Sequence, residues 1–387
     1  MDYFLTEEQL EIKRLARRIA ETHILPQREQ LDRSAEFPHA IMQEIAEAGL
    51  PAIYIPEEYE GIGGGVLDLC LATEEISRAC GGVGVTYAAS ALGSIPIIIG
   101  GSDQQKKKYL PPIAAGEHYA AFCLTEAGAG SDAGNIQTTA RKVGEDYVIN
   151  GTKQWITNGC EAHTYTVFAK TDKERGARGM SAFVVEKGNP GLKFGKKEDK
   201  LGIRCSATYE VIFEDCVVSK EDLLGREGGG FGIAMRTFEK SRPGIGAQAI
   251  GIAQGAFDTA LDYAHTREQF GQPILNFQAV SFMLADMAIQ IEAARALTYQ
   301  VARMIDSGSK NYGKESAMCK VFPSDVAMAV TTDAIQIMGG YGYMKDYPAE
   351  KYFRDAKITQ IYEGTNQIQR SIIASALVRE LASRQRG

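Results

Sequence analysis

The sequence predicts an α+β protein in which a helical region, a β region and a second helical region follow one another along the chain. Apolar residues recur with a helical period towards both ends and with a period of two in the middle. Strands do not alternate with helices, so a parallel nucleotide-binding sheet is not expected. At about 100–200 residues per domain, 387 residues allow two or three domains. We place three, at residues 1–118, 119–225 and 226–387.

The first region opens with a signal for the start of a helix. Thr6 and Gln9 have the spacing of a capping box. The apolar residues that follow keep a helical period: Leu10, Ile12, Leu15 and Ile19. Residues 37–50 and 103–116 repeat this period, with glycine and proline marking the ends. A helical domain is therefore predicted.

The middle region has the pattern of antiparallel strands. Residues 163–172, 179–188 and 209–218 alternate or run apolar, with many β-branched and aromatic side chains. Residues 143–159 contain a turn signal between two strand-like pieces. We expect a barrel or a sandwich.

The helical period returns in the third region. One face of the segment 277–305 carries an apolar row: Phe277, Val280, Leu284, Met287, Ile291 and Ala294. Residues 244–257, GIGAQAIGIAQGAF, are rich in small side chains, which allow helices to approach closely.

Composition argues against several classes of protein. The net charge of −7 provides no basic field for nucleic acid. Seven scattered cysteines without C-x-x-C and five dispersed histidines predict neither disulfides nor a metal site. The N-terminus is too acidic for a transit peptide, and the apolar run 91–101 is short and interrupted by Pro96. We expect a cytoplasmic protein without a membrane span.

Residues 124–134, LTEAGAGSDAG, give the strongest loop signal. Three glycines expose backbone N–H groups, and Thr125 and Ser131 add hydroxyls. The glycine spacing is not that of a Rossmann fingerprint. An ordinary turn and a contact with a phosphate or a flat polar ring are both open.

Trp155, the only tryptophan, lies in KQWITNG near a predicted strand end. Such a residue is usually part of the core. The alternative is a ring near a planar cofactor, with Thr157 on the same face of the strand.

Three further motifs allow a structural or a ligand-binding interpretation. Arg267, in HTREQFGQP, is either a surface charge or a fork for a pyrophosphate. A helix C-cap explains at least one of the three glycines in QIMGGYGY, residues 336–343. Glu239 and Arg242 are three residues apart, as in a surface ion pair or a polar clamp on a ligand.

Glu363, in QIYEGTNQIQR, is a lone carboxylate between an aromatic residue and a glycine. Uncharged hydrogen-bonding side chains follow, with no other charge until Arg370. A helix cap, a solvated loop charge and a base aimed at a substrate all fit this pattern.

The order of these motifs resembles the acyl-CoA dehydrogenase family over essentially the whole chain. The motifs that carry the resemblance are LTEAGAGSD, WITNG, TREQFG, QIMGGYGY and IYEGTNQIQR. FQAVSFMLADMA and FEKSRP look most like the short- and medium-chain, straight-chain branch. The resemblance implies that family's fold, with a C-terminal four-helix bundle, and the FAD-dependent oxidation of an acyl-CoA thioester to trans-2-enoyl-CoA.

The resemblance also implies binding residues for FAD. One set lines the flavin: Phe122, Leu124, Thr125, Ser131, Trp155 and Thr157. Another set reaches the FAD of a neighbouring subunit: Arg267, Phe270, Gln278, Gln336 and Gly340. Thr365 and Gln367 match a segment that contacts the dinucleotide. A homotetramer, built as a dimer of dimers, is therefore implied.

The residues implied to contact acyl-CoA are Ser131, Glu239, Arg242, Tyr362 and Gly364. Glu239 replaces the commoner Asp of a D-x-x-R pair, which keeps the charge and lengthens the arm. Glu363 matches the base that removes the α proton while a hydride passes to flavin N5. Some branches place the base where this chain has Ser241, which cannot serve.

Three activities are compatible with the resemblance, and a non-enzymatic function is the alternative to them. The first is a dehydrogenase that passes electrons to an electron-transfer flavoprotein. The second is an enoyl-CoA reductase that works in reverse with the same partner. An acyl-CoA oxidase is disfavoured because such chains are longer, and a non-enzymatic CoA-binding scaffold is disfavoured because Glu363 is present. The length and branching of the acyl group are not predicted.

Overall fold

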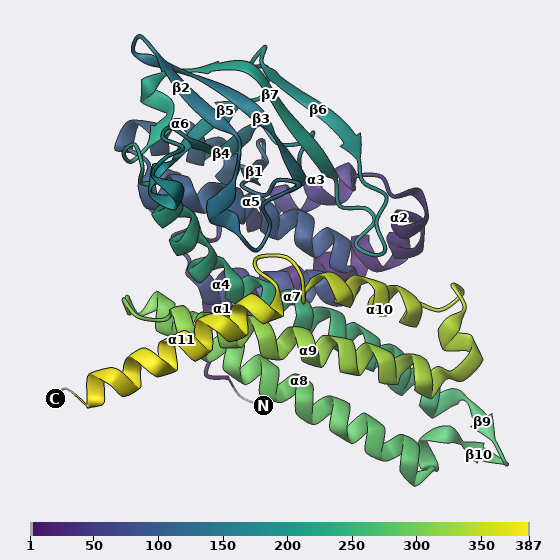
Figure 1. The fold of residues 1–387 in the computed structure, drawn as a ribbon. Coiled ribbons are helices and arrows are strands. Elements are labelled where there is room, and N and C mark those ends of the chain that lie inside the picture. The colour runs from purple at the N-terminus through teal and green to yellow at the C-terminus, as the bar shows by residue number, and fades with distance from the viewer. Residues whose placement is uncertain (1–2, 386–387) are drawn as a thin grey trace.

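The computed structural model describes residues 3–385, which form helices, then a β-sheet, then long helices (Figure 1). Residues 1–2 and 386–387, at the ends of the first and third predicted domains, lie outside the described range. The N-terminal helices are α1 (Glu7–Ile19), α2 (Arg28–Ser34), α3 (His39–Glu47), α4 (Val66–Ala79), α5 (Gly81–Gly100) and α6 (Asp103–Ala114). The predicted capping box is confirmed, because Thr6 Oγ1 accepts from Gln9 N and Gln9 Oε1 accepts from Thr6 N, both at 3.2 Å.

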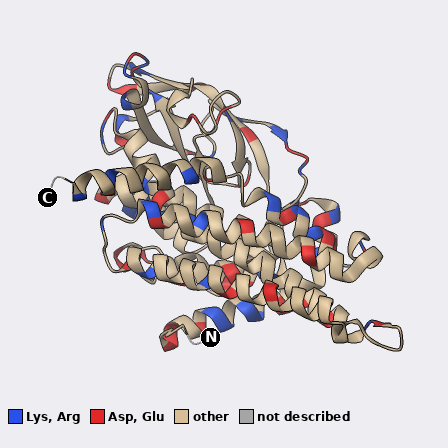
Figure 2. Cartoon of the chain, turned by 60° about the horizontal axis from the view of Figure 1, so that its bottom comes forward, with Lys and Arg blue, Asp and Glu red and all other residues tan. Residues whose placement is uncertain are grey.

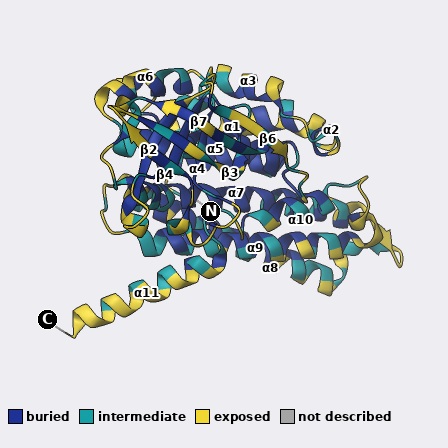
Figure 3. Cartoon of the chain, turned by 45° about the horizontal axis from the view of Figure 1, so that its top comes forward, coloured by how far each residue is buried: buried dark blue, intermediate teal, exposed yellow. Residues whose placement is uncertain are grey.

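α5 differs from the prediction that Pro96 interrupts the apolar run, because the helix continues through it to Gly100. Among the described residues, this is the one helix whose length and hydropathy would suit a membrane span, but 72% of the relevant window is buried inside the protein. Gly93 lies so close to the backbone of Ala121 that a Cβ on Gly93 would be 2.6 Å from Ala121 N. α5 is therefore a core helix (Figure 3), and the apolar contacts outweigh the hydrogen bond that proline removes.

The middle region is an eight-stranded sheet. Its strands are β1 (Ala120–Cys123), β2 (Thr139–Val143), β3 (Asp146–Thr157), β4 (Thr164–Lys170), β5 (Met180–Glu186), β6 (Leu192–Lys197), β7 (Thr208–Val218) and β8 (Leu223–Leu224). The order is β6-β7-β3-β2-β4-β5-β8, and β1 pairs with β4. The sheet is antiparallel except where β1, and one residue pair of β2, run parallel to β4.

The neighbouring strands β4 and β5 are buried on both faces, which explains the apolar runs within them. Tyr165 and Phe183 lie in the core formed by the sheet's own strands. Phe168 packs on the opposite side in the same cluster as Ile97 of α5 and Ile113 of α6. The sheet is thereby fixed to the N-terminal helices.

β3 is one strand where two pieces were expected. Its register with β7 shifts between Ile149 and Gly151, so the predicted turn is an irregularity inside the strand. A second shift lies between Lys153 and Ile156 and contains Trp155, whose φ is 59°. Such a bulge redirects side chains locally. Strict alternation therefore does not hold at this end of the strand.

The C-terminal region consists of α7 (Gly230–Thr266), α8 (Gln278–Asp306), α9 (Gly313–Met338), α10 (Ala349–Ile358) and α11 (Asn366–Arg384). A short hairpin of β9 (Glu268–Gln269) and β10 (Gln272–Pro273) extends from the far end of the bundle (Figure 1). The apolar face predicted for α8 is buried at Leu284, Met287, Ile291 and Ala294. Charges of both signs are interspersed along these helices (Figure 2).

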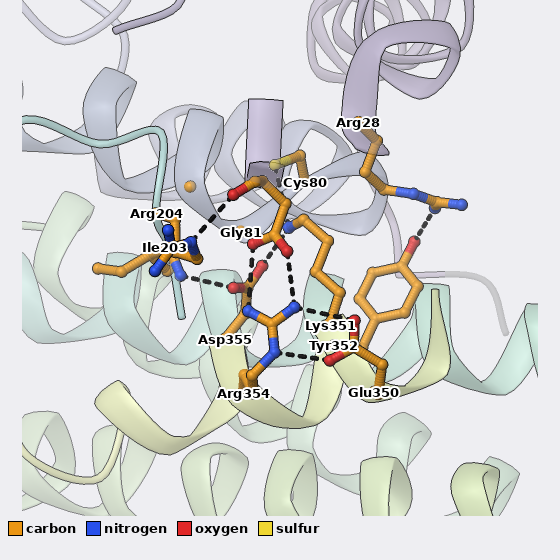
Figure 4. Close-up of polar contacts among 12 residues, drawn as sticks. Arg28, Cys80, Gly81, Ile203, Arg204, Glu350, Lys351, Tyr352, Arg354 and Asp355 are labelled. Carbon is orange, nitrogen blue, oxygen red and sulfur yellow. Dashed lines mark hydrogen bonds and ion pairs between the residues drawn. The ribbon is translucent and has the colours of Figure 1, made fainter. Parts of the chain in front are cut away.

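α10 lies where the three regions meet (Figure 4). The Asp355 carboxylate accepts from Ile203 N and from Lys351 Nζ, both at 2.5 Å. Arg354 forms an ion pair with Asp32 of α2 at 2.6 Å. These contacts attach α10 to an N-terminal helix and to a loop of the β region, and so fix the turn that follows α10.

Small residues let α7 touch its neighbours through backbone atoms, as predicted. A Cβ on Gly246 would lie 2.4 Å from Cys319 O of α9. A Cβ on Gly251 would lie 2.3 Å from Glu74 O of α4. These distances are shorter than any Cβ contact can be, so both positions require glycine.

We predict that Gly251→Ala destabilises the protein by about 1–3 kcal/mol, because α4 and α7 must separate to admit the methyl group. Gly232→Ala is the control, since it lies in the same helix and a Cβ there meets nothing within 4 Å. The control should be neutral or should stabilise by up to about 1 kcal/mol. Urea unfolding measures both, and an equal loss in the two variants would contradict the packing argument.

Candidate active site

Glu363 lies in the turn between α10 and α11, and its backbone is left-handed with φ of 52°. Gly364 continues this conformation with φ of 90°. Gln369 Nε2 donates to the carbonyl oxygens of both residues at 3.0 Å, and Thr365 Oγ1 accepts from Ile368 N at 3.3 Å as the cap of α11. The turn therefore holds Glu363 in a conformation that a non-glycine residue rarely adopts.

The Glu363 side chain faces α7 and α9. Ser241 Oγ of α7 donates to Glu363 Oε2 at 2.5 Å. Burial raises the pKa of Glu363 to about 7, although the Ser241 hydrogen bond and the charges of Arg242 and Lys320 act in the opposite direction. A carboxyl with a pKa near neutrality can take and release a proton under ordinary conditions. Because Glu363 is also partly buried and hydrogen-bonded to Ser241, it is not a freely solvated loop charge.

Two buried cations accompany this carboxyl. Arg242 of α7 is 4% exposed, and its Nε has no hydrogen-bond partner among the described residues. Lys320 of α9 is fully buried and donates to Asn366 Oδ1 at 2.8 Å. Burial lowers the pKa of Lys320 to about 7, with Glu363 acting to raise it. The surface ion pair considered for Glu239 and Arg242 was wrong, because Arg242 is buried.

Glu239 and Tyr362 border the same region. Glu239 O, in α7, accepts from Ser316 Oγ at 2.6 Å, and a Cβ on Gly313 would lie 2.9 Å from Glu239 Oε1. Tyr362 donates its hydroxyl to Gln248 Oε1 of α7. Arg242 thus lies within electrostatic range of both Glu363 and Glu239, and Tyr362 attaches the turn to α7 at Gln248.

The glycine-rich loop follows β1 and is open at its surface. A Cβ added to Gly128 or Gly130 would meet nothing within 4 Å, and neither residue has a positive φ. The fold itself therefore does not require glycine at these two positions. Backbone N–H groups that a ligand can approach without side-chain hindrance suit a flat or phosphorylated cofactor.

The other residues expected to line a flavin surround this loop. Phe122 packs against Phe168 and Phe238 at ring-centroid distances of 4.9 and 5.2 Å. Leu124 is buried, Thr125 and Thr157 are partly buried, and Ser131 is exposed. Gln154 N donates to Thr125 O at 2.9 Å, which joins the loop to β3.

Trp155 follows directly after this junction and is 55% exposed. The core interpretation of Trp155 was therefore wrong, because the bulge turns the side chain away from the interior of the sheet. An exposed aromatic surface beside an open glycine loop fits the alternative, a planar cofactor.

Five predicted residues lie instead at the far end of the bundle (Figure 1): Arg267, Phe270, Gln278, Gln336 and Gly340. The Arg267 guanidinium lies 5.7 Å from the centre of the Tyr341 ring, beside Gly340. Phe270 is 94% exposed in the β9–β10 turn. A Cβ on Gly340 would meet nothing within 4 Å, whereas Gly339 caps α9 with a positive φ. The structure does not bring this set to Glu363 or Trp155 of the same chain.

Sequence reasoning missed Glu126 and Lys153, which form a buried ion pair behind the loop, and also Lys320 and Gln369. The available signal was a charged residue inside an otherwise apolar segment. Lys153 interrupts β3 and Lys320 interrupts the apolar face of α9. Thr365 and Gln367 lie at the start of α11, with Gln367 exposed.

Comparisons with known proteins match this arrangement along the chain. The acyl-CoA dehydrogenase N-terminal, middle and C-terminal domain families match residues 6–117, 121–216 and 228–378. An acyl-CoA dehydrogenase of Bacillus subtilis is 48% identical over 97% of this chain and 99% of its own length. The mouse mitochondrial short-chain specific acyl-CoA dehydrogenase is 48% identical over 98% of this chain and 92% of its own length.

Two solved structures have the same fold over nearly all of their lengths. Butyryl-CoA dehydrogenase from Megasphaera elsdenii superposes with a TM-score of 0.95 at 44% identity, covering 98% of this chain and 100% of that one. A chain from work on the electron transferring flavoprotein of Acidaminococcus fermentans and electron bifurcation gives 0.96 at 53% identity, with the same coverage. The chain therefore belongs to the acyl-CoA dehydrogenase family of FAD-dependent oxidoreductases, and its cofactor is FAD.

We predict that Glu363→Gln stabilises the protein increasingly as the pH rises. The folded protein retains the Glu363 proton at pH values where the unfolded chain, with a pKa near 4.5, has lost it, so wild-type stability falls between pH 4.5 and about 7. The advantage of the variant should grow from pH 5 to pH 8 by up to about 3 kcal/mol. Urea unfolding at both pH values measures it. Glu36→Gln, at an exposed position, is the control, and a pH-independent difference for Glu363→Gln would contradict a desolvated carboxyl.

Proposed function

We propose that this protein catalyses the α,β-dehydrogenation of an acyl-CoA thioester to the trans-2-enoyl-CoA, with Glu363 as the base. The observation that carries the proposal is the Glu363 carboxyl, held by Ser241 and raised by burial to a pKa of about 7. Such a group can accept a proton from the carbon next to a thioester carbonyl. When bound, FAD supplies the hydride acceptor, its N5.

The neighbouring side chains have separate tasks in this proposal. Lys320 and Arg242 favour the ionised form of Glu363 before the proton is taken. Arg242, with its unpartnered Nε, and Glu239 bind acyl-CoA together with Ser131. Tyr362 and Gly364 border the acyl group beside the base.

The FAD-binding residues are proposed in three groups. Phe122, Leu124, Thr125, Ser131, Trp155 and Thr157 contact the flavin, which the open loop and the exposed Trp155 ring support. Thr365 and Gln367 contact the dinucleotide. The far-end set described above reaches the FAD of a partner subunit, which its outward exposure supports.

A homotetramer is proposed because two apolar surfaces remain exposed to solvent in the described chain. One is Phe270 in the hairpin, and the other lies on α11, which is exposed along much of its length (Figure 3). The α11 side chains are Leu377, Val378 and Leu381. The domain limits 1–118, 119–225 and 226–387 and a cytoplasmic location are part of the same proposal.

The substrate and the electron acceptor are proposed from the relatives. Short-chain specific enzymes and a butyryl-CoA dehydrogenase are among the proteins most similar to this chain, which supports a short acyl group. The neighbour from work on an electron transferring flavoprotein supports such a protein as the acceptor. A reductase that works in the opposite direction with the same partner is the second candidate, and this same neighbour supports it equally.

We predict that butyryl-CoA bleaches the oxidised flavin of the purified protein without oxygen. Glu363→Gln should retain FAD but bleach more slowly by several orders of magnitude, because a general base acts only in the transition state. Anaerobic stopped-flow absorbance measures both proteins. A variant that keeps more than roughly a tenth of the wild-type rate would remove Glu363 from its role.

The same experiment separates the alternatives. Reoxidation by air should be slow, because bound product keeps oxygen from the flavin. Rapid reoxidation with stoichiometric peroxide would indicate an oxidase. A reductase would be indicated if acyl-CoA did not bleach the flavin and if crotonyl-CoA restored the colour of flavin that dithionite had bleached.

We predict that Arg267→Ala loses FAD and assembles poorly, because two phosphate charges lose a counter-ion at a subunit interface. Sedimentation and the ratio of flavin to protein absorbance measure the two effects together. Arg33→Ala, which removes a surface arginine paired with Glu29, is the control. A tetramer with full flavin content would make Arg267 an ordinary surface charge.

A further inference from the structure

A buried ion pair lies behind the two segments proposed to contact the flavin. Lys153 of β3 is fully buried, and Glu126 of the glycine-rich loop is 7% exposed. Lys153 Nζ donates to Glu126 Oε1 at 2.7 Å and to Leu124 O at 3.0 Å. One ammonium group therefore binds both the carboxylate and the backbone of the loop.

Glu126 uses its remaining acceptor capacity on backbone amides. Its Oε1 also accepts from Thr138 N at 3.0 Å, and its Oε2 accepts from Gln137 N at 2.5 Å. Its own backbone exchanges hydrogen bonds with Ala129, at 3.2 and 3.0 Å. The backbone of Glu126 thus closes the loop that carries Gly128, and its carboxylate ties this loop to the residues just before β2.

Lys153 lies in β3 next to the residue that bonds the glycine-rich loop. The next residue, Gln154, donates its backbone N–H to Thr125 O at 2.9 Å. Trp155 follows, in the bulge and with a left-handed φ of 59°. The ion pair and this hydrogen bond together set the position of the loop relative to the indole.

The electrostatics favour a role in geometry over a role in stability. Burial lowers the pKa of Lys153 to about 8, and Glu126 opposes this shift. Burial alone would raise the pKa of Glu126, but Lys153 and the amide donors bring it below its usual value. A buried pair of this kind is often no more stabilising than apolar side chains of the same volume. A buried pair with several hydrogen bonds to the backbone does, however, fix one arrangement of the groups around it.

We propose that Glu126 and Lys153 are positioning residues for FAD, which hold the loop 124–131 and Trp155 in the arrangement that receives the flavin ring. The inference rests on the proposed FAD contacts of these two segments. It assigns no contact with FAD to either charged group. The pair acts through Leu124, Thr125 and Trp155.

The test measures FAD binding by apoprotein, without turnover. Lys153→Met, Glu126→Gln and the double variant are titrated with FAD, following flavin fluorescence and the visible absorption bands. Each single variant should bind FAD about 10–100-fold more weakly, as is usual when a supporting partner of a bound group is lost. The flavin bands should shift, and the double variant should recover part of the affinity because no unpaired buried charge is left.

Glu74→Gln is the matched control, because it disrupts a buried ion pair of 2.8 Å with Arg295 between α4 and α8. It should lower the melting temperature and leave FAD affinity and the flavin bands unchanged. Folded single variants that bind FAD like the wild type would overturn the proposal. The proposal would also be overturned if the control lost FAD affinity, and if its loss per degree of lowered melting temperature equalled that of the loop variants. FAD binding would then depend only on overall stability.

The outcome is independent of the proposed reaction. A wild-type protein that binds FAD but is not bleached by acyl-CoA would remove the dehydrogenase proposal and leave this titration interpretable. The single variants could fail to fold while the double variant folds and binds FAD with wild-type affinity and unshifted bands. That result would show that the pair is purely structural, and it would overturn the inference.

Discussion

The backbone contact of α7 with α4 and α9 is the constraint on which the rest of the structure depends. α7 is 37 residues long, and glycine allows its backbone to touch α9 at Gly246 and α4 at Gly251. At its other end, a Cβ on Gly230 would lie 2.5 Å from Ser181 C in β5. One helix therefore joins the sheet to the bundle. Ser241 stands between these contacts, which is how a side chain of α7 meets a carboxyl that lies 122 residues further along the chain.

The same packing raises the pKa of Glu363 and makes its ionised form unfavourable in the folded protein. Burial of the carboxyl raises its pKa to about 7, so the ionised form is less stable in the folded protein than in water. Lys320 and Arg242 reduce this penalty without removing it. The turn holds because Gln369 bonds two of its carbonyls and Lys320 bonds Asn366 at the start of α11. A destabilised group kept in place by its surroundings is typical of an active site.

Sequence patterns correctly predicted those features that depend on interactions within one helix or strand. The capping box at Thr6 and the buried face of α8 follow from hydrogen bonding and periodicity within one element. Pro96 and Trp155 were misjudged because tertiary packing decides whether a helix continues through proline and which way a bulged residue points. The lone carboxylate in the turn was recognisable, but its burial and its partner Ser241 come from distant elements. Glu126 and Lys153 look like exceptions to apolar periodicity until the fold pairs them.

Two sets of buried charges in this protein differ in how far their hydrogen bonds are satisfied. Lys153 donates to the Glu126 carboxylate and to Leu124 O, and Glu126 also accepts from two backbone amides, so the pair is engaged within the protein and fixes a conformation. Arg242 is buried with an unpartnered Nε among the described residues, and Glu363 receives a single side-chain hydrogen bond. Leaving a buried polar group incompletely satisfied costs about 1–3 kcal/mol. A bound molecule that completes the set would offset that cost, which supports the proposal that the substrate binds beside α7.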